Sequence, residues 1–209
     1  MTWADGTMDE LERRGPVGFV LAGMLSLATV GYGGFGEMAG LWTVIWPLVV
    51  VGFGGMLLAG VVGLLGLYPA LGQLASGLAA VAGAAAVIAG LAATSWIVTG
   101  ALGMSPWELP ESFASLVLLG GLGAFLASFL LFGVGILRTG SHPRSVGALL
   151  AFAGLSFVAP LADEVLGWHP PEWLPVGMFG LWGVVLIGVG ILLRTTGRSR
   201  SEIRVPSRV

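Results

Sequence analysis

Two short segments rich in tryptophan, glutamate and proline carry most of the side chains that could do chemistry. They are MSPWELPES, residues 104–112, and WHPPEWLPV, residues 168–176, and each joins two long apolar runs. Together with nearby carboxylates they predict a candidate outer-face surface for a partner protein or a cation. Its residues are Glu37, Trp107, Glu108, Glu111, Asp163, Glu164, His169, Glu172 and Trp173.

The residue types of this surface allow three interpretations. Tryptophan is a favoured anchor of protein interfaces, which suits a docking surface, and oxygen-rich clusters suit Ca²⁺ or Mg²⁺. His169 and Glu172 have the i,i+3 spacing of a helical ligand pair, but the two prolines between them prevent that helix. We prefer the third interpretation, in which the tryptophans form an interfacial belt and the acids are solvated. The tryptophans expected in outer loops or outward halves of spans are Trp42, Trp46, Trp96, Trp107, Trp168, Trp173 and Trp182.

The composition indicates a protein whose main solvent is a lipid bilayer. Of the 209 residues, 56% are hydrophobic and 10% are charged, whereas a soluble domain is typically about 25% charged. The chain has no cysteine and no lysine, which excludes disulfides, thiolate metal sites and a catalytic cysteine or lysine. Both histidines fall in expected loops, which argues against haem ligation and an intramembrane base. We therefore predict a non-enzymatic protein without a cofactor, a resident metal or a nucleic-acid partner.

Six apolar segments are long enough to cross the hydrocarbon as helices, which takes roughly 20 residues each. Such unbroken runs differ from barrel strands, which alternate over about ten residues. The predicted fold is an all-α membrane protein with six transmembrane helices in residues 16–193 and a turn at Tyr68-Pro69. The expected spans are residues 16–35, 41–68, 71–102, 113–137, 146–167 and 174–193.

The arginines predict which side of the membrane each loop faces. With six spans, the N-terminal segment 1–15, the loop 138–145 and the tail 194–209 share one side and hold all nine basic residues. The positive-inside rule then places both termini in the cytoplasm, and we expect a multi-pass protein of the plasma membrane. The basic segments act as a topology signal, or they also contact anionic lipid or a cytoplasmic partner. The candidate contacts are Arg138, Arg144, Arg194, Arg198 and Arg200.

Glycine patterns suggest internal repetition and close helix packing. The fourth span ends GVGILRTG (133–140) and the sixth ends GVGILLRTTG (188–197), which fits three helical hairpins descended from one unit. Chance is the alternative, because the chain has 36 glycines. Small residues four apart let helices approach closely, either inside the bundle, which we prefer, or across a dimer. The pairs with this spacing are Gly36 and Gly40, Ala79 and Gly83, and Ala86 and Gly90.

The stretch GVGILRTGSHPRSVGALLAFAGL (133–155) joins two glycine-rich spans through an arginine-bearing turn. This pattern resembles multispan integral membrane proteins of haloarchaea and high-GC actinobacteria. The resemblance covers this hairpin and the general plan of six spans, and the absence of lysine with acidic outer loops is typical of a haloarchaeal member. The resemblance implies a fold of six membrane spans, and it implies no catalytic residues.

Three functions follow from these features. We favour a subunit or accessory partner of a membrane complex, because the spans lack charge and the aromatic residues gather on one side. The alternative is a small transporter or channel for a neutral or cationic solute, suggested by glycine and proline in the spans and by the acidic outer loops. A membrane enzyme acting at the outer headgroup layer through His169 is the least favoured. The expected partners are the lipid bilayer and another membrane protein or a second copy of the chain.

Overall fold

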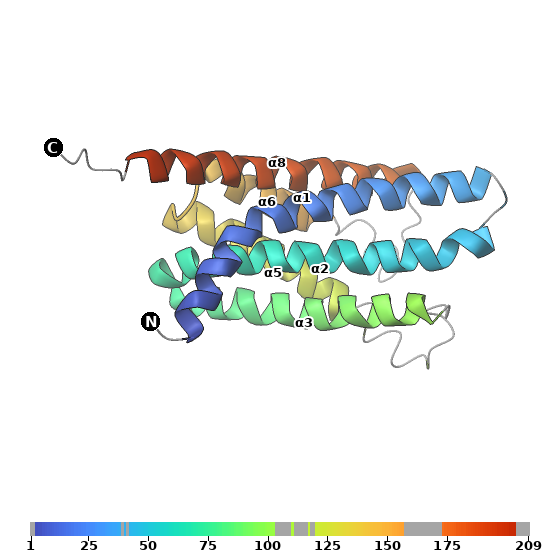
Figure 1. Cartoon of the computed structure of the whole chain (residues 1–209), viewed down its shortest axis with the longest axis horizontal. Coiled ribbons are helices and arrows are strands. Elements are labelled where there is room, and N and C mark those ends of the chain that lie inside the picture. Colours follow the sequence, from blue (N-terminus) through green and yellow to red (C-terminus); the bar gives the residue numbers. More distant parts are fainter. Residues whose placement is uncertain are drawn as a thin grey trace.

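A computed structural model describes most of the chain as a bundle of helices (Figure 1). The regular secondary structure of the described residues is helical, and these residues contain no strand. These residues are 3–38, 40, 42–102, 110, 117, 120–156 and 173–203. Within them the six helices are α1 (Trp3–Met38), α2 (Trp42–Leu74), α3 (Ser76–Ala101), α5 (Gly121–Thr139), α6 (Arg144–Ser156) and α8 (Trp173–Ile203).

Five of these helices are long and apolar enough to cross a membrane. The described part of α6 has 13 residues, which is fewer than the roughly 20 that a span needs. The remainder of the predicted span 146–167 lies outside the described residues. The prediction of an all-helical fold is therefore confirmed for the described residues, and five of its helices have segments long and apolar enough to span a membrane. They are Glu10–Tyr32, Pro47–Leu74, Ser76–Ala101, Gly121–Thr139 and Val176–Thr196.

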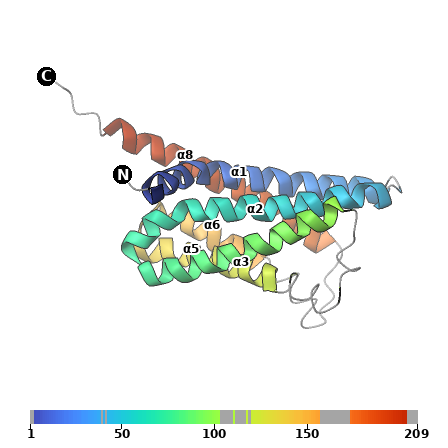
Figure 2. The same ribbon diagram turned by 60° about the horizontal axis from the view of Figure 1, so that its bottom comes forward.

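The helices pack as a closed ring. Helix α1 lies against α2 and α8, α3 lies between α2 and α5, and α6 lies between α5 and α8. Helix α2 also contacts α5 across the ring. Figures 1 and 2 show that neighbouring helices run in opposite directions, so α1 begins and α8 ends at the same end of the bundle. The α2–α3 corner and the α5–α6 turn lie at that end too.

The predicted turn at Tyr68-Pro69 is wrong, because α2 continues through Pro69 to Leu74. The helical conformation is interrupted instead at Ala75, where φ is -150° and ψ is 69°. Packing holds the helix beyond the proline, since Leu71 is fully buried. The corner also keeps its backbone hydrogen bonds: the Ala75 N–H donates to the Leu71 carbonyl over 2.8 Å, and the Ala75 carbonyl accepts the Ala79 N–H over 2.9 Å. Pro69 has no backbone N–H to donate, and the packing around Leu71 offsets the loss of that one hydrogen bond.

Two helices extend beyond the apolar runs that predicted them. Helix α1 begins at Trp3, so Pro16 lies inside it. Figure 1 shows its first turns inclined to the remainder, as expected where a proline interrupts a helix. An i,i+4 ion pair between Glu10 and Arg14 supports this polar part. Helix α8 continues to Ile203, well past the predicted end at 193.

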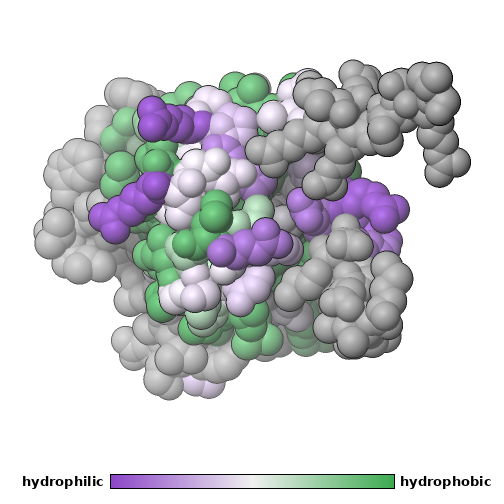
Figure 3. Space-filling view, turned by 90° about the vertical axis from the view of Figure 1, so that its left-hand side faces the viewer, coloured by the Kyte–Doolittle hydropathy of each residue, from purple (hydrophilic) through white to green (hydrophobic). Residues whose placement is uncertain are grey.

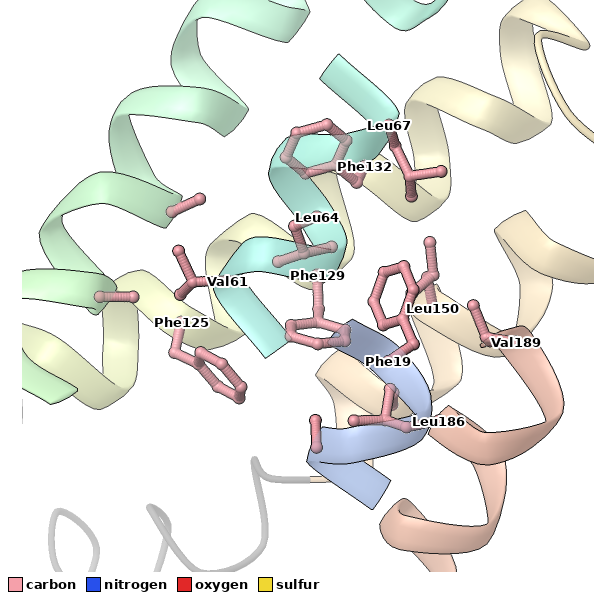
Figure 4. Close-up of a cluster of buried hydrophobic side chains, with 14 of the residues drawn as sticks. Phe19, Val61, Leu64, Leu67, Phe125, Phe129, Phe132, Leu150, Leu186 and Val189 are labelled. Carbon is pink, nitrogen blue, oxygen red and sulfur yellow. The ribbon is translucent and has the colours of Figure 1, made fainter. Parts of the chain in front are cut away.

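Large aromatic side chains fill the centre of the ring (Figure 4). Phe19 of α1, Phe125 and Phe129 of α5, and Trp182 of α8 form what we call the central aromatic cluster, and each is at most 1% exposed. The ring centroids of Phe125 and Phe129 lie 4.8 Å apart, and Trp182 lies 5.6 and 5.7 Å from them. Lipid tails are as apolar as these rings, so tight packing rather than removal from water stabilises the cluster.

Glycines bring several helices into backbone contact. A Cβ placed on Gly18 of α1 would lie 2.8 Å from the Gly63 nitrogen of α2, and one on Gly133 of α5 would lie 2.5 Å from the Ala151 nitrogen of α6. A real Cβ atom does not come this close to a backbone nitrogen, so these helix crossings require glycine. The predicted packing role of Gly40 is wrong: it is a turn residue with φ of +65° and no neighbour within 4 Å of its would-be Cβ.

The other small-residue pairs lie at contacts inside the bundle. Ala79 and Ala86 of α3 are fully buried. A Cβ on Gly83 would lie 3.1 Å from the ring of Tyr68, and one on Gly90 would lie 3.4 Å from Val61 Cγ1. Both neighbours belong to α2, so these positions serve α2–α3 packing within the chain.

Candidate functional site

The predicted outer-face surface falls mainly outside the residues that the structure describes. Glu37 lies in the last turn of α1 and Trp173 begins α8, and for these two the backbone is placed. Figure 1 shows both helix ends at the end of the bundle opposite the α5–α6 turn. The members outside the described residues are Trp107, Glu108, Glu111, Asp163, Glu164, His169 and Glu172.

The arginines gather at the other end of the bundle, which we call the basic end. It comprises the start of α1, the α5–α6 turn and the last turns of α8, which Figure 1 places together. Figure 3 looks onto this end and shows hydrophilic side chains scattered over it among apolar ones. Its arginines with described side chains are Arg13, Arg14, Arg138, Arg144 and Arg194, and all five are exposed. The backbone of α8 continues through Arg198 and Arg200.

A short turn holds Arg138 and Arg144 at the same end. Arg138 lies in the last turn of α5, where a cation complements the helix dipole. Gly140 caps α5 in the left-handed conformation with φ of +66°, and its N–H donates to the Ile136 carbonyl over 2.9 Å. Glycine adopts this conformation without strain. Four residues then suffice to reverse the chain before α6 begins at Arg144.

The polar groups of this turn bond to one another. The Thr139 hydroxyl donates to the Gly135 carbonyl over 2.8 Å and lies 3.3 Å from the Ser141 N–H, which donates to it. The imidazole Nδ1 of His142 lies 3.5 Å from the buried Ser141 hydroxyl. Hydrogen bonds within the turn therefore hold its shape between Arg138 and Arg144.

The charges of the basic end are mostly unbalanced within the described part of the chain. Arg14 pairs with Glu10, and both side chains are well exposed. Exposed pairs of this kind contribute about 0–1 kcal/mol. Arg138, Arg144 and Arg194 have no acidic partner among the described side chains. At this end the five described arginine side chains outnumber the described glutamates Glu10 and Glu12, so the arrangement presents net positive charge, which suits anions.

The buried hydroxyls of the spans are satisfied by backbone carbonyls. Thr99 donates to the Ser95 carbonyl over 2.7 Å and Ser128 to the Phe125 carbonyl over 2.6 Å, each within its own helix. Ser26 of α1 instead donates to the Phe179 carbonyl of α8 over 2.8 Å. Among the described residues no group of three histidines or carboxylates could hold a metal ion. These hydroxyls therefore serve structure rather than ligand binding.

Sequence reasoning misplaced Trp182 and overlooked Arg13. Trp182 was expected in the interfacial belt, but it is 1% exposed in the central aromatic cluster. Arg13 belongs to the basic end although it was not among the predicted lipid or partner contacts. The sequence offers one signal for it, since Val17 and Leu21 follow Arg13 four and eight residues later.

Comparisons of the chain with protein-family models, with curated proteins and with solved structures find no match.

Proposed function

We propose that this chain is a non-enzymatic polytopic membrane protein that serves as a subunit or accessory partner of a membrane complex. The observation that carries the proposal is the filled centre of the helix ring. The central aromatic cluster joins α1, α5 and α8, and Phe132, Leu64 and Leu186 around it are also fully buried. An interior of this kind gives stability and a fixed outer shape rather than a path for a solute.

The chemistry of the described spans supports the same function. The buried hydroxyls of the helices belong to serine and threonine and bond to backbone carbonyls over 2.6–2.9 Å. The buried indole N–H of Trp182 is likewise uncharged. Ionisable side chains in the membrane interior usually mark proton relays and solute sites. The arginines and glutamates whose side chains are described instead lie at the basic end, and they are Glu10, Glu12, Arg13, Arg14, Arg138, Arg144 and Arg194.

The proposal includes a topology of six spans in the plasma membrane. The sixth span consists of α6 and residues that follow it, and both termini lie in the cytoplasm. It is supported by the gathering of the arginines at one end of the ring, since basic residues near span ends favour the cytoplasmic side. The start of α1 and the end of α8 lie at the same end of the bundle, which supports placing both termini on one side of the membrane.

Native mass spectrometry of the full chain, extracted gently from its own membranes in several detergents, tests this function. We expect a second polypeptide at one fixed stoichiometry. A photoreactive residue at Leu91, which is 67% exposed on α3, should cross-link to that polypeptide. The matched control at Leu64, which is fully buried, should cross-link within the chain. A lone chain in every detergent would overturn the proposal.

A small transporter or channel for a neutral or cationic solute is the second candidate. The observation that favours it is the closed ring of six described helices around one axis. The central aromatic cluster would then be the barrier. In proteoliposomes, Phe129→Ala would raise solute flux above wild type, whereas Phe152→Ala, at an exposed position on α6, would not. Equal flux in both variants and in protein-free vesicles would remove this candidate.

A further inference from the structure

An arginine terminates the lipid-facing stripe of α1. Val17, Leu21 and Met24 are exposed, and their spacing of four and three residues places them on one face of the helix, while the exposed Arg13 precedes Val17 by about one turn, on the other side of Pro16. Val17 is 53% exposed and Met24 is 59% exposed, as expected for side chains that contact lipid tails. Arg13 therefore lies at the end of the exposed apolar stripe of α1, on the side of the basic end.

Helix α6 repeats this arrangement. Arg144, Ala148, Phe152 and Leu155 are exposed at the same spacing of four, four and three residues. Leu155, which is 58% exposed, is the most exposed large apolar residue in the described part of α6. Arg144 is the first residue of the helix, so it too marks the end of a lipid-facing stripe.

Helix α8 ends its stripe with an arginine as well. Val184 and Ile191 are exposed seven residues apart, which is two helical turns, and Arg194 follows three residues later on the same side. This helix runs toward the basic end, whereas α1 and α6 run away from it. The arginine accordingly comes last in the stripe of α8 and first in the other two.

These three helices are neighbours in the ring. Helix α8 packs against α1 on one side and against α6 on the other. The α2–α3 corner, which lies at the same end, instead exposes uncharged residues, namely Gln73, Leu74, Ser76 and Gly77. The positive charge of Arg13, Arg144 and Arg194 is thus concentrated on the α6–α8–α1 side of the basic end.

We propose that the α6–α8–α1 side of the basic end binds the phosphate groups of anionic phospholipids through Arg13, Arg144 and Arg194. Guanidinium presents a planar fork of donors that matches phosphate oxygens. Each of these arginines continues an exposed apolar stripe, so acyl chains can lie along the helix while the headgroup meets the charge. A soluble acidic protein segment would use the charge but not the stripe beneath it, and lipid is therefore the better fit.

Lipid titration of the purified full chain, followed by native mass spectrometry, tests this binding. Phosphatidylglycerol should bind wild type more tightly than phosphatidylcholine. The variant R13Q/R144Q/R194Q should lose on the order of a hundred-fold in phosphatidylglycerol affinity, because a basic residue near an anionic surface contributes roughly five-fold. Its phosphatidylcholine affinity should fall much less, because the choline cation of that lipid offsets the phosphate charge. Each single variant should lose roughly five-fold, which keeps the test decisive if the triple variant folds poorly.

Arg14→Gln is the matched control, since Arg14 is exposed next to Arg13 but already pairs with Glu10. It should bind phosphatidylglycerol as wild type does. Equal loss in Arg14→Gln and Arg13→Gln would overturn the proposal, and so would equal affinity of wild type for the two lipids. Equally tight binding of a soluble poly-glutamate peptide would assign the surface to a protein partner and would also overturn it. The outcome is independent of the proposed subunit function, because a lone chain can still select anionic lipid.

Discussion

Gly15 of α1 and Gly66 of α2 bring the two helices into backbone contact near the basic end. A Cβ built on Gly66 would lie 2.6 Å from the Cα of Gly15 and 2.8 Å from the Leu11 carbonyl oxygen. Real side chains do not approach backbone atoms so closely, so the crossing exists only with glycine at this position. The polar first turns of α1 depend on it, because Leu11 lies within them.

Replacing Gly66 with alanine should therefore force α1 and α2 apart. We expect a loss of about 1–3 kcal/mol in the free energy of unfolding, which is typical of overpacked interiors. Gly55→Ala on the same helix is the control, because its Cβ would lie 3.5 Å from Leu25 Cδ1, an ordinary contact. Thermal unfolding in detergent, followed by tryptophan fluorescence, measures both. Equal midpoints for the two variants would contradict this view of the crossing.

Ser26→Ala should weaken the contact between α1 and α8. The Ser26 hydroxyl is 1% exposed and donates to the Phe179 carbonyl of α8 over 2.8 Å. Interhelical hydrogen bonds in membrane proteins contribute about 0.6 kcal/mol on average and up to about 1.7 kcal/mol. Thr94→Ala removes an exposed hydroxyl that bonds its own helix over 2.9 Å, and it should leave the unfolding midpoint unchanged. A midpoint for Ser26→Ala equal to wild type would show that the contact contributes nothing measurable.

Phe129→Ala should be the more damaging of two phenylalanine truncations. Phe129 is fully buried between Phe19, Phe125 and Trp182, and Phe152 is 46% exposed on α6. Truncating a core phenylalanine typically costs about 3–5 kcal/mol, because the cavity collapses only in part. Denaturant unfolding in mixed micelles should give a large loss for Phe129→Ala and a small one for Phe152→Ala. Similar losses would mean that the cluster is not the core of the folded chain.

The absence of native cysteine permits a clean test of topology. Ser145→Cys places an exposed thiol at the basic end, and Leu102→Cys places one at the far end of α3. In intact cells a membrane-impermeant maleimide should label Leu102→Cys and leave Ser145→Cys unlabelled until the cells are opened. The expectation rests on the positive-inside rule. The reverse pattern would place the termini outside the cell and overturn the proposed orientation.

The sequence by itself determined the class of the fold and the grouping of the arginines. Apolar runs of about 20 residues predict membrane helices because the signal is local: each span must satisfy its own backbone hydrogen bonds in lipid. An even number of passes then brings Arg13, Arg138, Arg144 and Arg194 to one end of the bundle, where the structure has them. The candidate outer-face carboxylates remain a prediction, since they lie outside the described residues.

Only the tertiary structure decided how those helices meet. Burial of Leu71 carries α2 beyond Pro69, and contacts with Phe125 and Phe129 draw Trp182 into the core rather than the headgroup layer. The order of the ring, which puts Arg13, Arg144 and Arg194 on three consecutive helices of the ring, is likewise a property of packing. Local sequence does not encode these outcomes because each depends on residues far apart in the chain, whose contacts outweigh the preference of any one residue.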